Sequence, residues 1–202
     1  MAKIDLKKEL ADLYNAPRKP SMVEVPSLPY LMVDGRGDPN DNAWFQEATG
    51  ALYAVSYTLK FKLKKGPQAL DYVVMPLQGL WWAKDMDVFV VNARKEWEWT
   101  LMILQPKEVT PEMFADACDE VRRKKGLEAV GQLRLETYHE GKAAQVMYVG
   151  PYTDEAPTIA DLHSFIGDNG CRPCGKHHEI YLGDPRRTAP ERLRTIIRQP
   201  VE

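Results

Sequence analysis

The sequence predicts an α+β fold in which a βαββ unit occurs twice, with antiparallel sheets around a central cleft. Two observations support this prediction: strand and helix patterns follow one another in that order in each half, and short stretches of the two halves resemble one another. Two such copies are expected to be related by a pseudo-twofold axis. Ligand pockets tend to form at repeat interfaces, so the cleft is expected there.

Length and charge restrict the possible classes of protein. The chain has 202 residues, enough for one well-buried domain or two intimately packed halves. Its 27 lysines and arginines against 29 aspartates and glutamates give a formal charge of −2. The basic run at residues 122–125 ends a predicted helix, where cations complement the carbonyl end of the dipole. A nucleic-acid partner is therefore not expected.

The N-terminal segment and the cysteines indicate the cellular compartment of the protein. Residues 1–13 alternate charged with apolar side chains, unlike a signal peptide, and no apolar run reaches membrane-spanning length. Three cysteines, an odd number, fit a reducing compartment better than a disulfide framework. We therefore expect a cytoplasmic protein with free thiols and no membrane partner.

The first half is predicted to contain a strand, a long helix and two further strands. Residues 23–33 are typical of an interrupted edge strand, because Pro26 and Pro29 break a run of β-branched and apolar residues. A helix capped by Asp41 or Asn42 extends to about residue 64. The two further strands are expected over residues 72–82 and 96–104.

A helix over residues 110–125 connects the halves, with Thr110 as its cap, Pro111 at its first position and Gly126 at its end. The second half begins with a hairpin around residues 140–141. Its predicted elements are strands over residues 133–139 and 142–149, a helix over 153–168, and strands over 177–182 and 193–198.

These elements define the predicted boundaries. Residues 1–21 are expected to be an N-terminal helix, over about 3–14, and a linker, and residues 22–202 a single domain, with repeat one over about 22–106 and repeat two over about 132–200. The matched stretches are 30–33 with 146–149, 72–77 with 177–182, and 101–106 with 195–200. Their separation falls steadily, as expected when the second copy has a shorter helix and tighter connections.

Four of the five tryptophans fall on two successive predicted strands: Trp81, Trp82, Trp97 and Trp99. A tryptophan-rich core is the ordinary interpretation. Strand alternation, however, sends Trp81 and Trp82 to opposite faces, so the two rings cannot fill one core layer. At least one is expected to face the groove or solvent, where aromatic faces suit flat and cationic ligands.

Glu179 is a carboxylate in the middle of a predicted strand, on the face that His177 and Tyr181 share. The alternative to a functional role is a solvated sheet face, since antiparallel sheets often keep one polar side. In an aromatic cleft, desolvation raises the pKa of such a carboxyl and a bound cation lowers it again. A ligand site anchored by Glu179 is therefore expected to couple cation binding to proton release.

The motif that contains Cys171 and Cys174, close to His177 and His178, is interpreted as an incidental loop pair. Structural zinc needs four converging ligands, whereas the two histidines alternate sides of a strand. A redox pair is expected at a helix N-terminus, and here a strand follows. Because the sequence also lacks a phosphate-binding loop and a serine nucleophile elbow, no metal and no cofactor are predicted.

The C-terminal sequence resembles that of the stand-alone GyrI-like small-molecule-binding proteins. The resemblance is carried by HHEIYLGDPRRTAPERL at residues 177–193 and TIIRQP at 195–200, with support from LQGLWW at 77–82 and VGPY at 149–152. It covers about residues 22–200. It implies the duplicated βαββ fold and a multidrug-type cleft in which Glu179 meets aromatic or cationic small molecules.

The same resemblance implies two other functions. Some stand-alone relatives hydrolyse cyclopropane-containing electrophilic antibiotics, in which case Glu179 is the general base and an aromatic donor stabilises the dienone oxygen. The candidate donors are Trp82, Trp99, Tyr148 and Tyr181. Gyrase-inhibitory relatives contact a protein partner. DNA binding is not implied, because about 20 residues before the first strand cannot hold a helix-turn-helix unit. The predicted ligand-binding residues are Glu179, Tyr181, Trp82, Trp99, Trp97, Trp81, Met147 and Tyr53.

Overall fold

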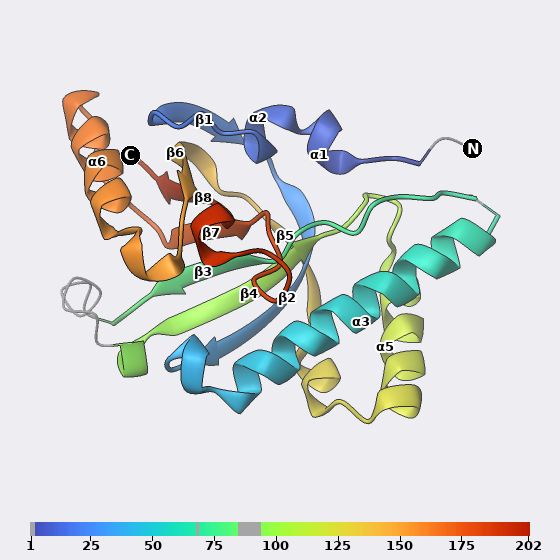
Figure 1. Ribbon diagram of the computed structural model, residues 1–202. Helices are drawn as coiled ribbons and strands as arrows, with labels where there is room; N and C mark the ends of the chain where they lie inside the picture. The colour runs from blue at the N-terminus through green and yellow to red at the C-terminus, as the bar shows by residue number, and fades with distance from the viewer. Residues whose placement is uncertain (1–2, 68, 85–93) are drawn as a thin grey trace. The chain divides into compact units, whose positions relative to one another are not determined.

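The computed structural model describes residues 3–67, 69–84 and 94–202 (Figure 1). The chain forms two compact units. The first unit comprises Met1–Leu6, Leu28–Met75 and Trp81–Tyr138, and the second comprises Lys7–Ser27, Pro76–Leu80 and His139–Glu202.

The predicted α+β class and the duplicated βαββ order are confirmed. The first copy consists of β2 (Leu28–Arg36), α3 (Ala43–Lys65), β3 (Gln78–Trp82) and β4 (Glu98–Leu104). The second consists of β6 (Gly141–Val149), α6 (Ala156–Asp168), β7 (His177–Tyr181) and β8 (Arg194–Pro200). Strand β3 begins among residues of the second unit and ends in the first. The short 3-10 helices are Pro39–Asp41, Arg94–Glu96, Glu128–Gln132, Tyr152–Asp154 and Pro190–Arg192.

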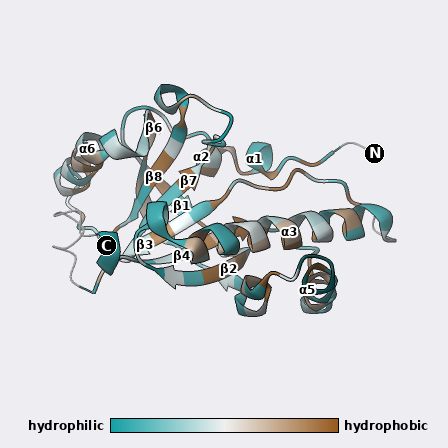
Figure 2. Cartoon of the chain, turned by 60° about the horizontal axis from the view of Figure 1, so that its bottom comes forward, coloured by the Kyte–Doolittle hydropathy of each residue, from teal (hydrophilic) through white to brown (hydrophobic). Residues whose placement is uncertain are grey.

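In the first unit, β4, β2 and β5 (Arg134–Tyr138) form an antiparallel sheet in that order, and helix α3 packs against it. Asn42 caps α3 by accepting a hydrogen bond from the Phe45 amide. Brown and teal residues alternate along the helix (Figure 2), as expected for one buried side. Its fully buried apolar residues are Ala48, Ala51, Leu52, Val55, Leu59 and Leu63.

Helix α5 (Pro111–Lys125) lies beside α3 within the first unit. The Thr110 hydroxyl accepts from the Met113 amide, Pro111 occupies the first helical position, and Gly126 ends the helix at φ 62°. Both predicted helix boundaries are therefore confirmed. The positive φ is a conformation that glycine adopts without the steric cost that a Cβ would bring.

In the second unit, the antiparallel strand order is β1 (Ser21–Val25), β6, β8, β7. Helix α6 covers one face, where Leu162 and Ile166 pack in one core cluster with Ala144, Val146 and Ile197. In place of one N-terminal helix, the chain forms two short helices, α1 (Leu6–Glu9) and α2 (Ala11–Tyr14). No helix among the described residues is long and apolar enough to span a membrane.

Two predictions about strands were wrong. The hairpin predicted around residues 140–141 does not form, because β5 pairs with β2 whereas β6 pairs with β1 and β8. Glu140, expected in an exposed turn, has a buried side chain held by ion pairs in the second unit. The strand predicted over residues 72–82 is limited to β3; Tyr72 instead forms an isolated bridge with Ile4.

The predicted strand over residues 23–33 is also divided. Pro26 lies between β1 and β2, and β1 pairs with β6 of the second unit. A segment counted in repeat one from its sequence position therefore belongs to the sheet of the second unit. Neither the proline pattern nor the alternation of apolar residues contains information about which distant strand is the partner.

A buried ionic network lies on the face of the second unit's sheet that α6 does not cover. Glu140 Oε1 lies 2.8 Å from His178 Nδ1, and Glu140 Oε2 accepts from Arg198 Nη1 at 3.1 Å. All three side chains are almost completely inaccessible to solvent. Burial raises the pKa of Glu140, but the His178 ring and the Arg198 guanidinium outweigh it and lower that pKa to about 2. The carboxylate is therefore ionised.

The remaining polar atoms of the network have partners as well. Arg198 donates from Nε and Nη2 to Gln145 Oε1 and from Nη2 to the Leu13 carbonyl. His178 Nε2 lies 3.0 Å from Gln78 Oε1, and Gln78 Nε2 donates to the Tyr14 hydroxyl at 2.7 Å. The network thus joins α2, β3, β6, β7 and β8. A buried charge is tolerated when it is paired and hydrogen-bonded in this way.

We expect Arg198→Met to lower the free energy of unfolding by about 3–5 kcal/mol, because the variant leaves the Glu140 carboxylate buried without its guanidinium. Urea unfolding followed by circular dichroism measures the loss. Arg172→Ala is the matched control: its ion pair with Glu202 is exposed and such pairs contribute about 0–1 kcal/mol. Equal losses in the two variants would contradict a structural role for the network.

Candidate functional site

Three of the predicted tryptophans form one aromatic cluster in the first unit. Phe45 of α3 stacks on Trp81 at a centroid distance of 6.1 Å and meets Trp99 edge-on at 5.2 Å. Trp97 meets Trp81 edge-on at 5.7 Å. We call Trp81, Trp97 and Trp99 the tryptophan cluster. The contacts with Phe45 place Trp81 and Trp99 on the α3 side of their sheet.

A glycine makes room for the most buried ring. Gly35 of β2 lies opposite Trp99 of β4, and a Cβ at position 35 would be only 2.1 Å from the Trp99 ring. Trp99 is fully buried, and its Nε1 has no hydrogen-bond partner within the described parts of the chain. The indole therefore lies directly over the backbone of the neighbouring strand, which only glycine permits.

Trp82 does not belong to this cluster. It alternates with Trp81 along β3, and its Nε1 donates to Glu98 Oε2 at 2.6 Å. Glu98 in turn alternates with Trp99 along β4. The prediction that Trp81 and Trp82 take opposite faces is consistent with these contacts. Tyr53, on α3, has its ring centroid 6.4 Å from that of the exposed Tyr57.

Glu179 lies in β7 of the second unit and is buried, with 8% of its surface exposed. This exposure excludes a solvated sheet face. Its partner across the ladder is Ile197, a member of the core cluster under α6, so the carboxylate lies on the α6 side of the sheet. Glu179 Oε1 lies 3.2 Å from His177 Nε2, and no second polar partner of this carboxylate occurs among the described residues.

Two predicted tyrosines share the face of Glu179. Tyr181 and Tyr148 both lie opposite Thr195 of β8, from its two sides. The Tyr148 hydroxyl donates to the Pro151 carbonyl at 2.8 Å, and Tyr152 meets the Tyr181 ring edge-on at 5.6 Å. Burial, with the charges of Asp154 and Glu155, raises the pKa of Tyr148, which keeps it a phenol and a donor.

The position of the Tyr148 ring explains the glycine of the VGPY motif at residues 149–152. Gly150 has a φ of 155°, and a Cβ there would lie 2.4 Å from the Tyr148 hydroxyl. The glycine therefore lets the chain turn back over the Tyr148 ring. The carbonyl of Pro151 is thereby brought to the hydroxyl that donates to it.

Met147 is the predicted site residue that the structure moves away from Glu179. It lies opposite Ile196, whose other partner is Ile180, so these three side chains occupy the face of the ionic network. Met147 and Glu179 were both predicted to be ligand-binding residues. The observed register of β6 and β8 separates them, since a shift of one residue moves a side chain to the opposite face.

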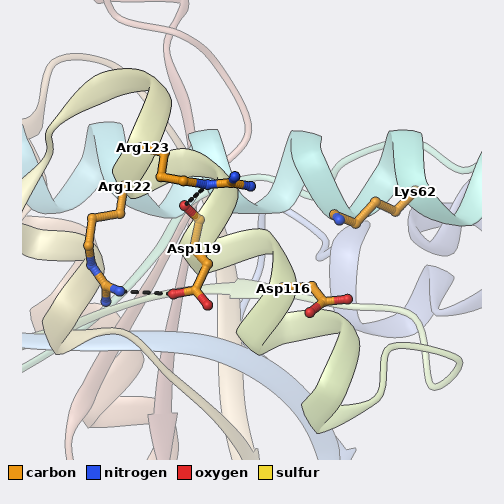
Figure 3. A pocket seen from close by; sticks show the side chains of 5 residues that line it. All are labelled: Lys62, Asp116, Asp119, Arg122 and Arg123. Carbon is orange, nitrogen blue, oxygen red and sulfur yellow. Dashed lines mark hydrogen bonds and ion pairs between the residues drawn. The ribbon is translucent and has the colours of Figure 1, made fainter.

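Two surface hollows occur in the first unit, and neither is lined by a predicted site residue. One, of about 440 Å³, is lined by Asp34, Trp44, Gln132 and Arg134. The other, of about 510 Å³, is lined entirely by charged residues of α3 and α5 (Figure 3): Lys62, Asp116, Asp119, Arg122 and Arg123. Arg122 and Arg123 both turn toward Asp119. Drug-sized ligand sites are mostly apolar, so the second hollow does not fit that class.

The three cysteines are free. Residues 172–174 run beside the end of β8, with the Cys174 amide donating to the Pro200 carbonyl and the Arg172 amide to the Glu202 carbonyl. In an extended segment, residues three apart are separated by about 10 Å, beyond the reach of a disulfide. Within the described residues, no three His, Cys, Asp or Glu side chains form a metal-binding group.

Sequence reasoning missed two residues of these groups. Phe45, which links Trp81 to Trp99, carries no signal beyond its place in the first turn of a helix. His177 was recognised as sharing the face of Glu179, but its closeness to the carboxylate was not anticipated. The period of two in the strand was the signal that could have identified it.

Comparisons with known proteins agree with this fold. The profile of the GyrI-like small molecule binding domain matches residues 18–202. An uncharacterized conserved protein from Listeria innocua is 40% identical with a TM-score of 0.91, and a hydrolase from the same organism is 39% identical with a TM-score of 0.87; each comparison covers 99% of this chain and 100% of the other. The EcmrR C-terminal domain shares the fold at 13% identity, TM-score 0.56, over 91% of this chain and 97% of that domain. Among curated proteins no match was found.

We expect Gly35→Ala to cost about 1–3 kcal/mol of stability, because the added methyl group overlaps the Trp99 ring and forces it to move. The displacement should also change the near-ultraviolet circular dichroism of the tryptophans. Gly50→Ala is the control, since it adds a methyl group to α3 where no atom lies within 4 Å. That variant should be neutral or more stable by up to about 1 kcal/mol. An unchanged tryptophan spectrum in Gly35→Ala would contradict the proposed overlap.

Proposed function

The chain belongs to the GyrI-like family of small-molecule-binding domains, and from this premise we propose that it binds flat aromatic and cationic molecules. Glu179 is the anionic anchor of the site, and Tyr148 and Tyr181, on the same face of the second unit's sheet, are its aromatic part. The observation that carries the proposal is a buried carboxylate on a rigid strand whose polar contact is a single histidine.

The Glu179 carboxylate can accept a further contact from a positively charged group of a ligand. An ionised carboxylate offers two oxygens and about four lone-pair sites, and the His177 contact reaches one oxygen at 3.2 Å. Burial removes most of the water that would otherwise solvate the group. A ligand cation compensates for that loss, and it does so more effectively here than at an exposed carboxylate because the surroundings screen less.

The tryptophan cluster of the first unit, taken by itself, also has ring faces of the kind that binds cations. The Arg94 guanidinium lies 5.6 Å from the centroid of the partly buried Trp97 ring, so this ring already contacts a cation within the chain. Trp99, fully buried behind Phe45, supports the cluster rather than contacting a ligand. Cation–π contacts contribute about 0.5–2 kcal/mol each and impose no directional hydrogen bond. Ligands that differ in shape can therefore share such a site.

We expect Glu179→Gln to weaken the binding of tetraphenylphosphonium at least tenfold, or about 1.4 kcal/mol, because the substitution removes the negative charge and keeps the shape. Quenching of tryptophan fluorescence measures the affinity. Glu24→Gln, on the exposed part of β1, is the matched control and should bind as the native chain does. Combining Glu179→Gln with Tyr181→Leu in a double-mutant cycle tests whether the two groups contact the same ligand. Unchanged affinity in Glu179→Gln would remove Glu179 from the site.

Hydrolysis of strained cyclopropane electrophiles is a second candidate function. The hydrolase from Listeria innocua, 39% identical over nearly the whole chain, favours it. In this reaction Glu179 takes a proton from water as the oxygen attacks a cyclopropane carbon, and the broken C–C bond delivers its electrons to the dienone oxygen. Tyr148 is the candidate donor to that oxygen, for which its hydroxyl must exchange the Pro151 carbonyl for the substrate.

Turnover distinguishes this enzyme from a binding protein. Incubation with a cyclopropane-containing dienone should yield a ring-opened product that has gained one water, and Glu179→Gln should abolish its formation. Mass spectrometry of the product during long incubation measures both. Saturable binding with no product in the native chain would exclude hydrolysis of that substrate and leave the binding function standing.

A further inference from the structure

His177 and Glu179 form a buried, contacting pair of side chains on one face of β7. The two residues alternate with His178, and the His177 Nε2 to Glu179 Oε1 distance is 3.2 Å. His177 is 3% exposed and Glu179 8%. Because water screens neither group well, a change of charge on one has a large effect on the other. The charge of the His177 ring therefore directly affects the affinity of any cation that binds Glu179.

Other histidines also influence this pair. The groups that interact electrostatically with His177 include His163 on α6 and His178 on the opposite face of β7. Burial lowers the pKa of His163, and the charge of His177 lowers it further. Burial is likewise the main cause of the lowered pKa of His178. The Glu179 carboxylate, 3.2 Å from Nε2, is a contact of His177 that attracts positive charge.

We infer that His177 is an internal competitor of cationic ligands for Glu179, so that the site holds cations when the imidazole is neutral and releases them when it gains a proton. This inference rests on the proposed function, because it takes Glu179 as the anchor. In the neutral state, Nε2–H donates to the carboxylate and leaves its charge available to the ligand. In the protonated state the imidazolium neutralises the carboxylate and repels a second cation.

The competition makes His177 a specificity-determining residue. A cationic ligand must displace the positive charge of a protonated His177, whereas a neutral aromatic ligand of the same shape does not. Acidification therefore weakens cation binding selectively and leaves contacts with neighbouring aromatic rings unchanged. The sign follows from linkage: a ligand that prefers the state with fewer bound protons binds more weakly as the pH falls.

The native chain provides the first test. Dissociation constants of tetraphenylphosphonium and of the neutral triphenylphosphine oxide are measured at pH 7.5 and pH 5.5, the range in which histidines change charge. We expect the phosphonium to bind roughly tenfold more weakly at pH 5.5. The phosphine oxide should change by less than about twofold, since no charge competition applies to it.

Variants identify the residue responsible. His177→Gln, with His177→Asn as a second choice if the first does not fold, should abolish the pH dependence of phosphonium binding. His139→Gln, at an exposed position before β6, and His163→Gln, on α6, should retain it. Thermal unfolding at both pH values confirms that each variant is folded.

The outcomes separate this inference from the proposed function. Phosphonium binding that is independent of pH in the native chain overturns the role of His177 and leaves the binding function intact. A pH dependence that survives in folded His177→Gln or His177→Asn also overturns it. Failure of the phosphonium to bind at either pH overturns both proposals.

Discussion

The buried contact between Glu140 and Arg198 is the constraint on which the second unit depends. Two charges removed from water are tolerated only with near-complete hydrogen bonding, and here His178, Gln145 and the Leu13 carbonyl supply it. These partners come from β6, β7, β8 and the N-terminal helix α2. Their relative positions are therefore specified more narrowly than apolar packing alone would require, because an aliphatic contact tolerates shifts that an ion pair does not.

The ionic network also determines which way Glu179 points. His178 faces the network, and in a strand the next residue must face the opposite side. Glu179 is thereby directed toward the side covered by α6, among the apolar residues around Ile197. The register of β7 against β8 thus places a different polar environment on each face of the sheet. In the first, the charges and polar atoms satisfy one another; in the second, a carboxylate has one histidine as its contact.

Much of the fold could be predicted from local patterns, because helices and their caps depend on residues close in sequence. Thr110 and Gly126 were identified from spacing, Asn42 was one of two candidate caps, and the βαββ order followed from periodicity. The hairpin prediction failed because strand pairing is a long-range property. The local sequence around Glu140 is typical of a turn, and it contains no information about the ion pair that Glu140 forms with Arg198, which is distant in sequence. That Met147 and Glu179 lie on opposite faces could not be predicted for a related reason, since the face of a residue depends on register.

The site itself was only partly predictable, and the physical reason concerns burial. Composition identified Glu179 and the tryptophans as unusual, yet a sequence does not state whether a strand carboxylate is solvated. The structure answers that question: Glu179 is buried, and its polar contact within the described chain is His177. Leaving a carboxylate so incompletely paired lowers stability. The fully paired network on the opposite face provides the rigidity that lets the second unit keep Glu179 in that state.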